Sequence, residues 1–282
     1  MTRILSVVSG KGGVGKTLFT GAFGITLARQ GYKVLLIDAD MGLRNLDLIL
    51  GLESDCLYTI CDLAEGRCFS EDAILPVMEN LDFLAADQRE TWDDILPAAI
   101  DTVLEDEADR YDFVLLDCPA GIGKGIAYAM SASERAVAIM APSWASARST
   151  GRVMQMMRQS IPVTMVLNQF VHKDLVGVSF EEAIETVDED DFGGVIPYSE
   201  EAARLSRRGE LPHFTEEGCF GQALTLVYKR ILKEREYPLS RWQSLLRLGA
   251  LENESFTTEK ENTAKSRWEK VRMNYKWRRG RW

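Results

Sequence analysis

The sequence has few of the residues from which metal centres and disulfide frameworks are built. Its 282 residues include five cysteines, at positions 56, 61, 68, 118 and 219, and no two of them form a C-x-x-C pair. Its two histidines, His172 and His213, are far apart. These spacings argue against structural zinc and against an iron–sulfur cluster. They predict reduced thiols in a cytoplasmic protein.

Long apolar runs are also absent. No stretch approaches the ~18 consecutive apolar residues of a membrane-spanning helix, so we expect none. Residues 1–8 carry one arginine before a short apolar run, and a glycine-rich loop follows at once, which is not the pattern of a secretory signal. Because 46% of the residues are hydrophobic, the chain can bury a large core. One α/β domain of about 250 residues is therefore expected.

Positive charge is scarce everywhere except at the C-terminal end. The net charge is −10, yet residues 264–282 (AKSRWEKVRMNYKWRRGRW) hold eight Lys/Arg and one Glu, or +7. The other 263 residues therefore carry −17. A body this acidic is a poor general binder of nucleic acid. The basic tail has the opposite charge and is considered separately from the body.

Continuous apolar runs alternate with helical patterns along most of the chain. Runs typical of buried strands occur at 3–8, 33–37, 81–86, 113–116, 135–141, 163–167 and 194–197. Helical patterns occur at 17–30, 90–109, 124–133, 146–159, 180–187 and 218–236. The alternation predicts an α/β fold with a mainly parallel, helix-covered sheet, whose ligands bind outside the carboxyl ends of the strands.

The composition changes after Tyr237-Pro238. We expect an α/β domain over residues 1–238 and a second segment over 239–263, followed by the basic, tryptophan-rich tail 264–282. Within the second segment, 240–251 could form a short helix, and the polar residues after it read as a linker.

A phosphate-binding loop follows the first predicted strand. Gly10 to Thr17 match G-x-x-x-x-G-K-[ST], in which backbone N–H groups wrap around nucleotide phosphates. Lys16 would reach the β- and γ-phosphates, and the Thr17 hydroxyl would bind Mg²⁺. The helix predicted after the loop ends at Gly31 and adds its positive N-terminal dipole. The pattern predicts binding of a nucleoside triphosphate but does not specify the reaction.

Two carboxylates end strands that lead toward this loop. Asp40 ends the second predicted strand, in Asp38-Ala39-Asp40, and Asp117 ends the strand FVLLD. Asp40 could hold a magnesium-bound water or orient the attacking water, and Asp117 could bind Mg²⁺ through water as a Walker B aspartate does. Either residue alone could merely cap a turn. Together on separate strands they favour a phosphoryl-transfer site with Thr17, Asp40 and Asp117 around the metal.

Asn168 follows the strand VTMVL, where a side-chain amide could recognise a base edge. The guanine-specific pattern N-K-x-D is absent, since the sequence reads Asn168-Gln169-Phe170-Val171. This favours ATP over GTP. Asparagine at a strand end is also a common turn residue, so both interpretations stay open.

Lys11 is a second lysine in the loop and has no obvious role in a monomer. Its side chain would leave the loop beside the phosphates, where it could serve a nucleotide held by a second subunit. Two facing loops would then exchange lysines and stabilise transition-state charge in trans, as an arginine finger does. The alternative is an exposed lysine with a neutral role, which spacing alone does not exclude.

GKGGVGKT resembles the deviant Walker A motif of the MinD/ParA ATPases, which belong to the SIMIBI class of P-loop NTPases. The resemblance covers roughly residues 1–238. It continues through DADMGLRNLDLILGLE (38–53), AEGRC (64–68), DCPAGI (117–122), GVIP (194–197) and RRGEL (207–211). Segment 38–53 resembles the MinD branch, the bacterial septum-site determinants, more than plasmid ParA.

The resemblance implies an ATPase that uses Mg²⁺, dimerises on ATP, binds a surface and leaves it on hydrolysis. The implied catalytic residues are Lys11, Lys16, Asp40 and Asp117. The implied ATP-binding residues are Gly10, Lys11, Gly12, Gly13, Val14, Gly15, Lys16, Thr17, Asn168 and Pro197, the last two beside adenine. For a MinD-like protein the surface is the inner face of the cell membrane, and the process is division-site selection.

Segment 143–152 (SWASARSTGR) departs from the family pattern. MinD proteins carry acidic residues there and use that surface to meet their division-inhibitor and activator partners. Here Arg148 is kept, but Ser149, Thr150 and Gly151 stand where acids are expected. A protein activator or division inhibitor is expected, but its identity is open.

The tail also departs from the family, whose short C-terminal helix inserts into the membrane. Its Lys/Arg and Trp residues fit anionic lipid headgroups, and 240–251 is a second membrane candidate. A basic aromatic tail could instead bind nucleic acid, or fold back onto the acidic body. We expect peripheral association with the inner membrane.

Other members and relatives of the class remain as alternatives. A flagellar or secretion-system positioning ATPase and a ParA-like DNA-partitioning ATPase share the motifs. A tyrosine kinase of this fold would need clustered tyrosines in the tail, which has only Tyr275. An iron–sulfur carrier would need paired cysteines near the C-terminus, where Cys219 stands alone.

Overall fold

The computed structural model describes residues 2–94, 97–171, 180–185, 189–233 and 235–255. The predicted basic tail, 264–282, lies outside the described residues.

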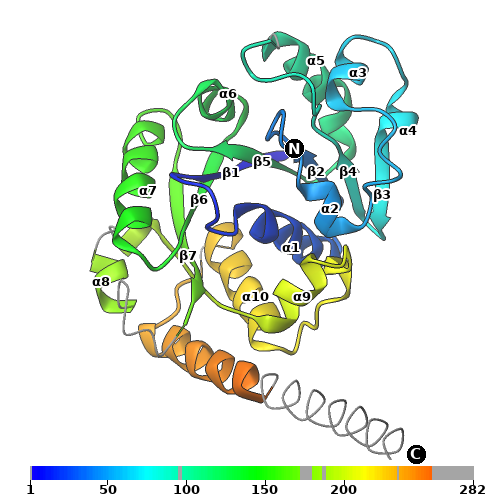
Figure 1. Cartoon of the computed structure of the whole chain (residues 1–282). Coiled ribbons are helices and arrows are strands. Elements are labelled where there is room, and N and C mark those ends of the chain that lie inside the picture. Colours follow the sequence, from blue (N-terminus) through cyan, green and yellow to red (C-terminus); the bar gives the residue numbers. More distant parts are fainter. Residues whose placement is uncertain (1, 95–96, 172–179, 186–188, 234, 256–282) are drawn as a thin grey trace, which may run out of the picture.

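An eight-stranded sheet forms the centre of the molecule (Figure 1). Its strands lie in the order β3-β4-β2-β5-β1-β6-β7-β8, and every neighbouring pair is parallel except β3 and β4. The mainly parallel sheet predicted from the sequence is confirmed. The strands are β1 (Arg3–Ser9), β2 (Val34–Asp38), β3 (Ile74–Met78), β4 (Leu81–Leu84), β5 (Phe113–Ala120), β6 (Arg135–Met140), β7 (Val163–Phe170) and β8 (Phe192–Pro197).

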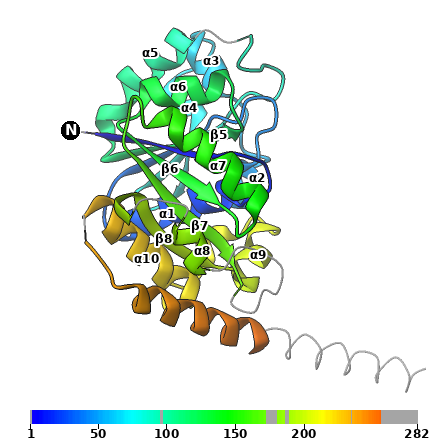
Figure 2. The same ribbon diagram turned by 90° about the vertical axis from the view of Figure 1, so that its left-hand side faces the viewer.

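Helices cover both faces of the sheet. Figures 1 and 2 show α1 and α10 on one face and α6 and α7 on the other. The helices are α1 (Lys16–Arg29), α2 (Leu46–Leu50), α3 (Ile60–Ala64), α4 (Ser70–Ala73), α5 (Pro97–Glu107), α6 (Lys124–Ala132), α7 (Trp144–Met157), α8 (Phe180–Glu185), α9 (Glu200–Ser206) and α10 (Cys219–Leu232). Short 3₁₀ turns are η1 (Ala108–Arg110), η2 (Glu189–Asp191) and η3 (Leu211–His213).

The central strands are apolar throughout because neither of their faces meets water. Leu5 and Val7 of β1, Leu36 of β2, and Val114 and Leu115 of β5 are all fully buried. This two-sided burial holds the carboxyl ends of β1, β2 and β5 side by side, and the sequence motifs lie at those ends.

The sequence analysis did not predict the edge strand β3. It runs antiparallel to β4, and its residues are partly or fully exposed. Pro76 lies in its middle, and the pairing register shifts between Pro76 and Met78. A short, half-exposed run with a proline lacks the continuous apolar pattern of the inner strands, so periodicity did not reveal it.

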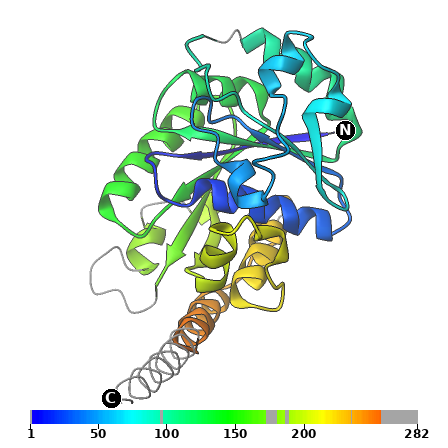
Figure 3. The ribbon, with the colours of Figure 1, turned by 45° about the vertical axis from the view of Figure 1, so that its right-hand side comes forward.

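Residues 239–255 form a helix that packs against the body, beside α10 and α9 (Figure 3). Trp242, Leu245 and Leu246 are buried. The Trp242 ring lies edge-on to Phe192, with ring centroids 6.1 Å apart. The helix therefore continues into the predicted linker, and the apolar side of the second membrane candidate is packed inward. Within the described ranges, no helix is long and apolar enough to cross a membrane.

Candidate functional site

The glycine-rich loop joins the carboxyl end of β1 to the first turn of α1. Gly13 and Gly15 have φ angles of 79° and 80°, in the left-handed region that favours glycine. A Cβ atom on Gly12 or Gly13 would meet no atom within 4 Å. The loop therefore presents an open cradle of backbone at the edge of the sheet.

Gly10 is required for packing. A Cβ atom at this position would lie 2.1–2.4 Å from backbone atoms of Ser149 and Thr150 in α7. Only glycine allows this approach between the start of the loop and α7. The structure therefore gives Gly10 a packing role, and its predicted contact with ATP stays a prediction.

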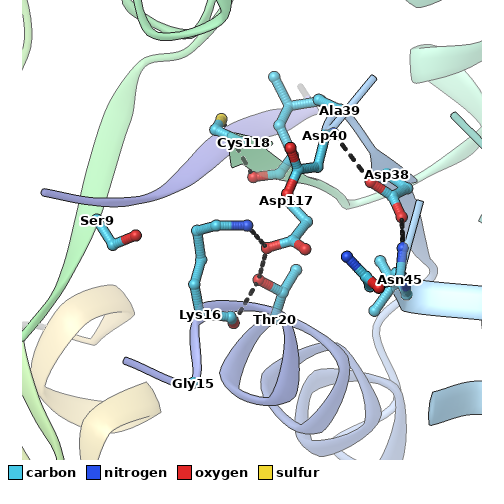
Figure 4. Close-up of polar contacts among 12 residues, drawn as sticks. Ser9, Gly15, Lys16, Thr20, Asp38, Ala39, Asp40, Asn45, Asp117 and Cys118 are labelled. Atoms are coloured by element: carbon cyan, nitrogen blue, oxygen red, sulfur yellow. Dashed lines mark hydrogen bonds and ion pairs between the residues drawn. The ribbon is translucent and has the colours of Figure 1, made fainter. Parts of the chain in front are cut away.

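Lys16 and Asp117 form a buried ion pair at the floor of the loop (Figure 4). The Lys16 Nζ atom donates to Asp117 Oδ1 at 2.8 Å, and the two side chains are 7% and 1% exposed. Burial alone would lower the pKa of Lys16, but the charge and hydrogen bond of Asp117 outweigh it and raise that pKa. Lys16 is therefore held protonated below the cradle.

Thr20 is a site residue that the sequence analysis missed. Its hydroxyl lies between Asp117 Oδ1, at 2.9 Å, and the Lys16 carbonyl, at 3.0 Å. The signal was present, because Thr20 follows Lys16 by four residues and so shares its helix face.

The second oxygen of Asp117, Oδ2, is buried and has no hydrogen-bond partner among the described residues. A buried acceptor without a partner destabilises a folded protein by roughly 1–3 kcal/mol, so a bound ligand that contacts this oxygen would remove that cost. Within the same residues, no cluster of three or more His, Cys, Asp or Glu side chains could hold a metal by itself. Mg²⁺ binds one or two carboxylates together with substrate phosphates, and Asp117 Oδ2 is available for it.

Asp38 shapes the segment that carries Asp40. It is fully buried; its Oδ1 accepts from the Asp40 N–H at 2.9 Å, and its Oδ2 accepts from the N–H groups of Asn45 and Leu46 at 3.0 Å. Burial, with the negative charge of Asp117, raises the pKa of Asp38 to about 7, against these hydrogen bonds. The sequence analysis singled out Asp40 and overlooked Asp38, the residue that positions it.

Asp40 is partly buried two residues beyond the end of β2, near Lys16 and Asp117 (Figure 4). Burial raises the pKa of Asp40, the Lys16 charge opposes that shift, and the Asp117 charge adds to it. The structure therefore brings together three predicted residues, Lys16, Asp40 and Asp117, while Thr17 lies partly buried in the first turn of α1.

Lys11 is exposed, and its side chain has no hydrogen bond or ion pair with any residue in the described ranges. Only its carbonyl is engaged, as the acceptor of the Ser9 hydroxyl at 3.1 Å. Its side chain is free to leave the loop, and its role stays a prediction.

Asn168 and Pro197, the predicted adenine neighbours, both have other contacts. The Asn168 Nδ2 group donates to the carbonyl oxygens of Val14 at 2.9 Å and Gly15 at 3.4 Å, and its side chain is 3% exposed. Asn168 thus fastens the phosphate loop to β7. Pro197 is buried at the end of β8, beneath Gly249. Their roles toward adenine stay predictions.

Helix α7 presents cationic and aromatic residues outward. Ser143 caps its first turn by accepting from the Ser146 N–H at 3.3 Å. Trp144 is 59% exposed, Arg148 and Arg152 are exposed, and the helix has no acidic residue. Its outer face is therefore positive on a predominantly acidic body.

Comparison with known proteins agrees with this geometry. Residues 5–212 match the model of the CobQ/CobB/MinD/ParA nucleotide binding domain. The chain is 42% identical over 155 residues to the septum site-determining protein MinD of Synechocystis sp., a match that covers 54% of this chain and 58% of that relative. The chain thus spans rather more than half of that relative's length.

Two solved structures are similar over most of the chain. MinD of Pyrococcus horikoshii, complexed with Mg-ADP, superposes with a TM-score of 0.73 at 29% identity, over 83% of this chain and 97% of that one. The MinC:MinD complex of Aquifex aeolicus gives 0.73 at 31% identity, over 86% and 99%. With the matched domain extending over well more than half of its residues, the chain belongs to the CobQ/CobB/MinD/ParA family of nucleotide-binding proteins.

Proposed function

We propose that this protein is a magnesium-dependent ATPase that dimerises on ATP, binds the inner face of the cell membrane and is released on hydrolysis. The observation that carries the proposal is the buried Lys16–Asp117 pair beneath an open glycine cradle, with Asp117 Oδ2 lacking a partner. The similarity to a MinD structure that holds Mg-ADP supports it.

Each residue of the site has a separate task. When nucleotide binds, Lys16 would donate its hydrogen bond to the phosphates instead of to Asp117. The Asp117 carboxylate and the Thr17 hydroxyl would then be free to hold Mg²⁺. Bound Mg²⁺ neutralises phosphate charge. Asp40, held by Asp38, orients the attacking water. Lys11 reaches the nucleotide of the second subunit, where it stabilises transition-state charge.

The cycle of membrane binding and release, here called the surface cycle, involves the C-terminal segment and the outer face of α7. Helix 239–255 leads into the basic tail, whose Lys/Arg and Trp residues suit anionic lipid headgroups. The process supported by the MinD relatives is division-site selection. Because α7 presents Trp144, Arg148 and Arg152 without a carboxylate, the activator or inhibitor that docks there needs an acidic segment. The same observation favours positioning of flagella or a secretion system as the second candidate.

Sedimentation with anionic liposomes tests the surface cycle. The full chain is compared with a version ending at Ser255, because the structure shows helix 239–255 to be part of the folded body. We expect the full chain to pellet with the liposomes in ATP and to stay in solution in ADP, and the shortened chain to stay in solution in both. Pelleting regardless of nucleotide, or retention of duplex DNA in a parallel assay, would point instead to a constitutive anchor or to a DNA-partitioning protein.

Replacing Asp40 with alanine is expected to slow stimulated ATP hydrolysis by about 100-fold, since the attacking water loses its acceptor. ATP binding should stay within about threefold of wild type, because Asp40 lies outside the loop that holds the phosphates. The variant should therefore stay on liposomes in ATP. Phosphate release and nucleotide titration measure the two effects, and full turnover by the variant would contradict the role of Asp40. Asp106→Ala, at an exposed position on α5, is the matched control.

A further inference from the structure

Helix 239–255 lies beyond the matched domain, yet its last turn holds two loops at the carboxyl end of the sheet. Asn253 bridges the loop after β8: its Nδ2 donates to the Tyr198 carbonyl at 2.7 Å, and its Oδ1 accepts from the Glu200 N–H at 3.0 Å. Glu200 is the first residue of α9, so Asn253 also serves a helix N-terminus from outside.

Glu252 makes an equivalent contact with α10. Both of its carboxylate oxygens accept from the Cys219 N–H, at 3.0 and 3.1 Å. The preceding residue, Gly218, provides no side-chain cap for that helix. A carboxylate at a helix N-terminus is stabilised by the helix dipole. The last turn of helix 239–255 is therefore fastened at two points.

Close packing at Gly249 brings the helix to this position. A Cβ atom on Gly249 would lie 2.8 Å from Cβ of Pro197 and 3.1 Å from Sγ of Cys219. Glycine at 249 thus allows the helix to lie directly on the residue that ends β8. A larger residue there would push the helix away from Pro197 and lengthen the Asn253 contacts.

A continuous set of contacts joins Asn253 to the phosphate loop. The Tyr198 N–H donates to the Phe170 carbonyl at 2.9 Å. Two residues before Phe170, Asn168 donates to the Val14 and Gly15 carbonyls. Gln169 between them has a φ of 59°, and a Cβ atom on Gly15 would lie 2.8 Å from its Nε2. Gln169 therefore lies beside the loop in a backbone conformation that L residues rarely adopt, so we expect a shift at the end of β7 to reach the loop.

We propose that Asn253 is a positioning residue for the nucleotide site, acting through Tyr198 and the end of β7 on the loop that holds the phosphates. The coupling is reciprocal, so nucleotide in the loop changes how firmly helix 239–255 is held. This inference rests on the proposed ATP binding and extends it to a segment outside the matched domain.

The test uses the full chain and two measurements, equilibrium binding of ATP with Mg²⁺ and hydrogen–deuterium exchange of the peptide covering 239–255. We expect Asn253→Ala to weaken ATP binding at least about fivefold, the lower end of typical coupling between sites. In wild type, ATP with Mg²⁺ should change amide exchange in 239–255. Ser255→Ala is the matched control, because among the described residues its hydroxyl bonds only to the Glu252 carbonyl of its own helix.

Asn253→Asp separates positioning from simple helix capping. Aspartate can still accept from the Glu200 N–H but cannot donate to the Tyr198 carbonyl, so it should weaken ATP binding as alanine does. Wild-type affinity in either Asn253 variant would overturn the proposal, as would exchange in 239–255 that ATP leaves unchanged in wild type. Absence of ATP binding by the wild-type chain would instead refute the proposed function. If circular dichroism shows that Asn253→Ala is unfolded, amide exchange in 239–255 of the wild-type chain, with and without ATP, still tests the proposal.

Discussion

Replacing Lys16 with methionine is expected to abolish ATP binding and to destabilise the fold at the same time. The variant removes the cation that meets the phosphates, and hydrolysis should fall by at least about 100-fold. It also leaves the Asp117 carboxylate buried without its ion-pair partner, which typically costs about 3–5 kcal/mol of unfolding free energy. Nucleotide titration and urea unfolding measure the two effects.

A matched control and a double variant separate the two roles of Lys16. Lys124→Met removes the lysine of an exposed ion pair with Asp93 and should change stability little. Lys16→Met combined with Asp117→Asn removes both charges, so stability should recover while ATP binding stays lost. A Lys16→Met variant that unfolds at the wild-type urea concentration would show that the buried pair does not stabilise the protein.

Replacing Lys11 with alanine is expected to leave the fold intact and to abolish ATP-dependent dimerisation and stimulated hydrolysis. Lys11 is exposed and its side chain makes no hydrogen bond or ion pair with a described residue, so unfolding free energy should stay within about 0.5 kcal/mol of wild type. A cation supplied in trans to phosphoryl transfer is worth about 10³-fold or more in rate. Analytical ultracentrifugation and phosphate release measure the losses, with the exposed Lys33→Ala as control.

Mixing two inactive variants shows whether Lys11 acts in its own subunit or across the dimer. In a mixed dimer of Lys11→Ala and Asp40→Ala, the Lys11→Ala subunit keeps Asp40 and receives Lys11 from its partner. Each mixed dimer would then have one competent site of two, so turnover per mixed dimer should reach about half of the wild-type value. No recovery on mixing, although mixed dimers form, would rule out the trans role.

Hydrophobic pattern predicted the interior of the fold better than its edges. The inner strands, such as β1, β5 and β6, are buried on both faces, so their apolar runs stand out in the sequence. Strand β3 contains Pro76 and is half exposed, and α2 and α3 have only five residues each, too few for a helical period. The extent of helix 239–255 was missed because polar residues at its end contact other segments of the chain.

Within the site, the motifs predicted which residues meet but not every contact between them. Lys16, Asp40 and Asp117 lie together because the ends of parallel strands meet at one edge of a sheet. Asp38 and Thr20 were missed, since a carboxylate that binds backbone N–H groups and a hydroxyl in a helix have no spacing signature of their own. The contact between Gly10 and α7 joins segments about 140 residues apart, which no local pattern reports.

Pro76 has a consequence for how copies of this protein can meet. A strand at the edge of a sheet offers unpaired N–H and C=O groups on which a strand from another molecule can grow, and long edges of this kind lead to aggregates. Proline cannot donate there, and the register shift beside it bends the edge out of line. Growth of a sheet from one copy of the chain to the next is therefore disfavoured at β3.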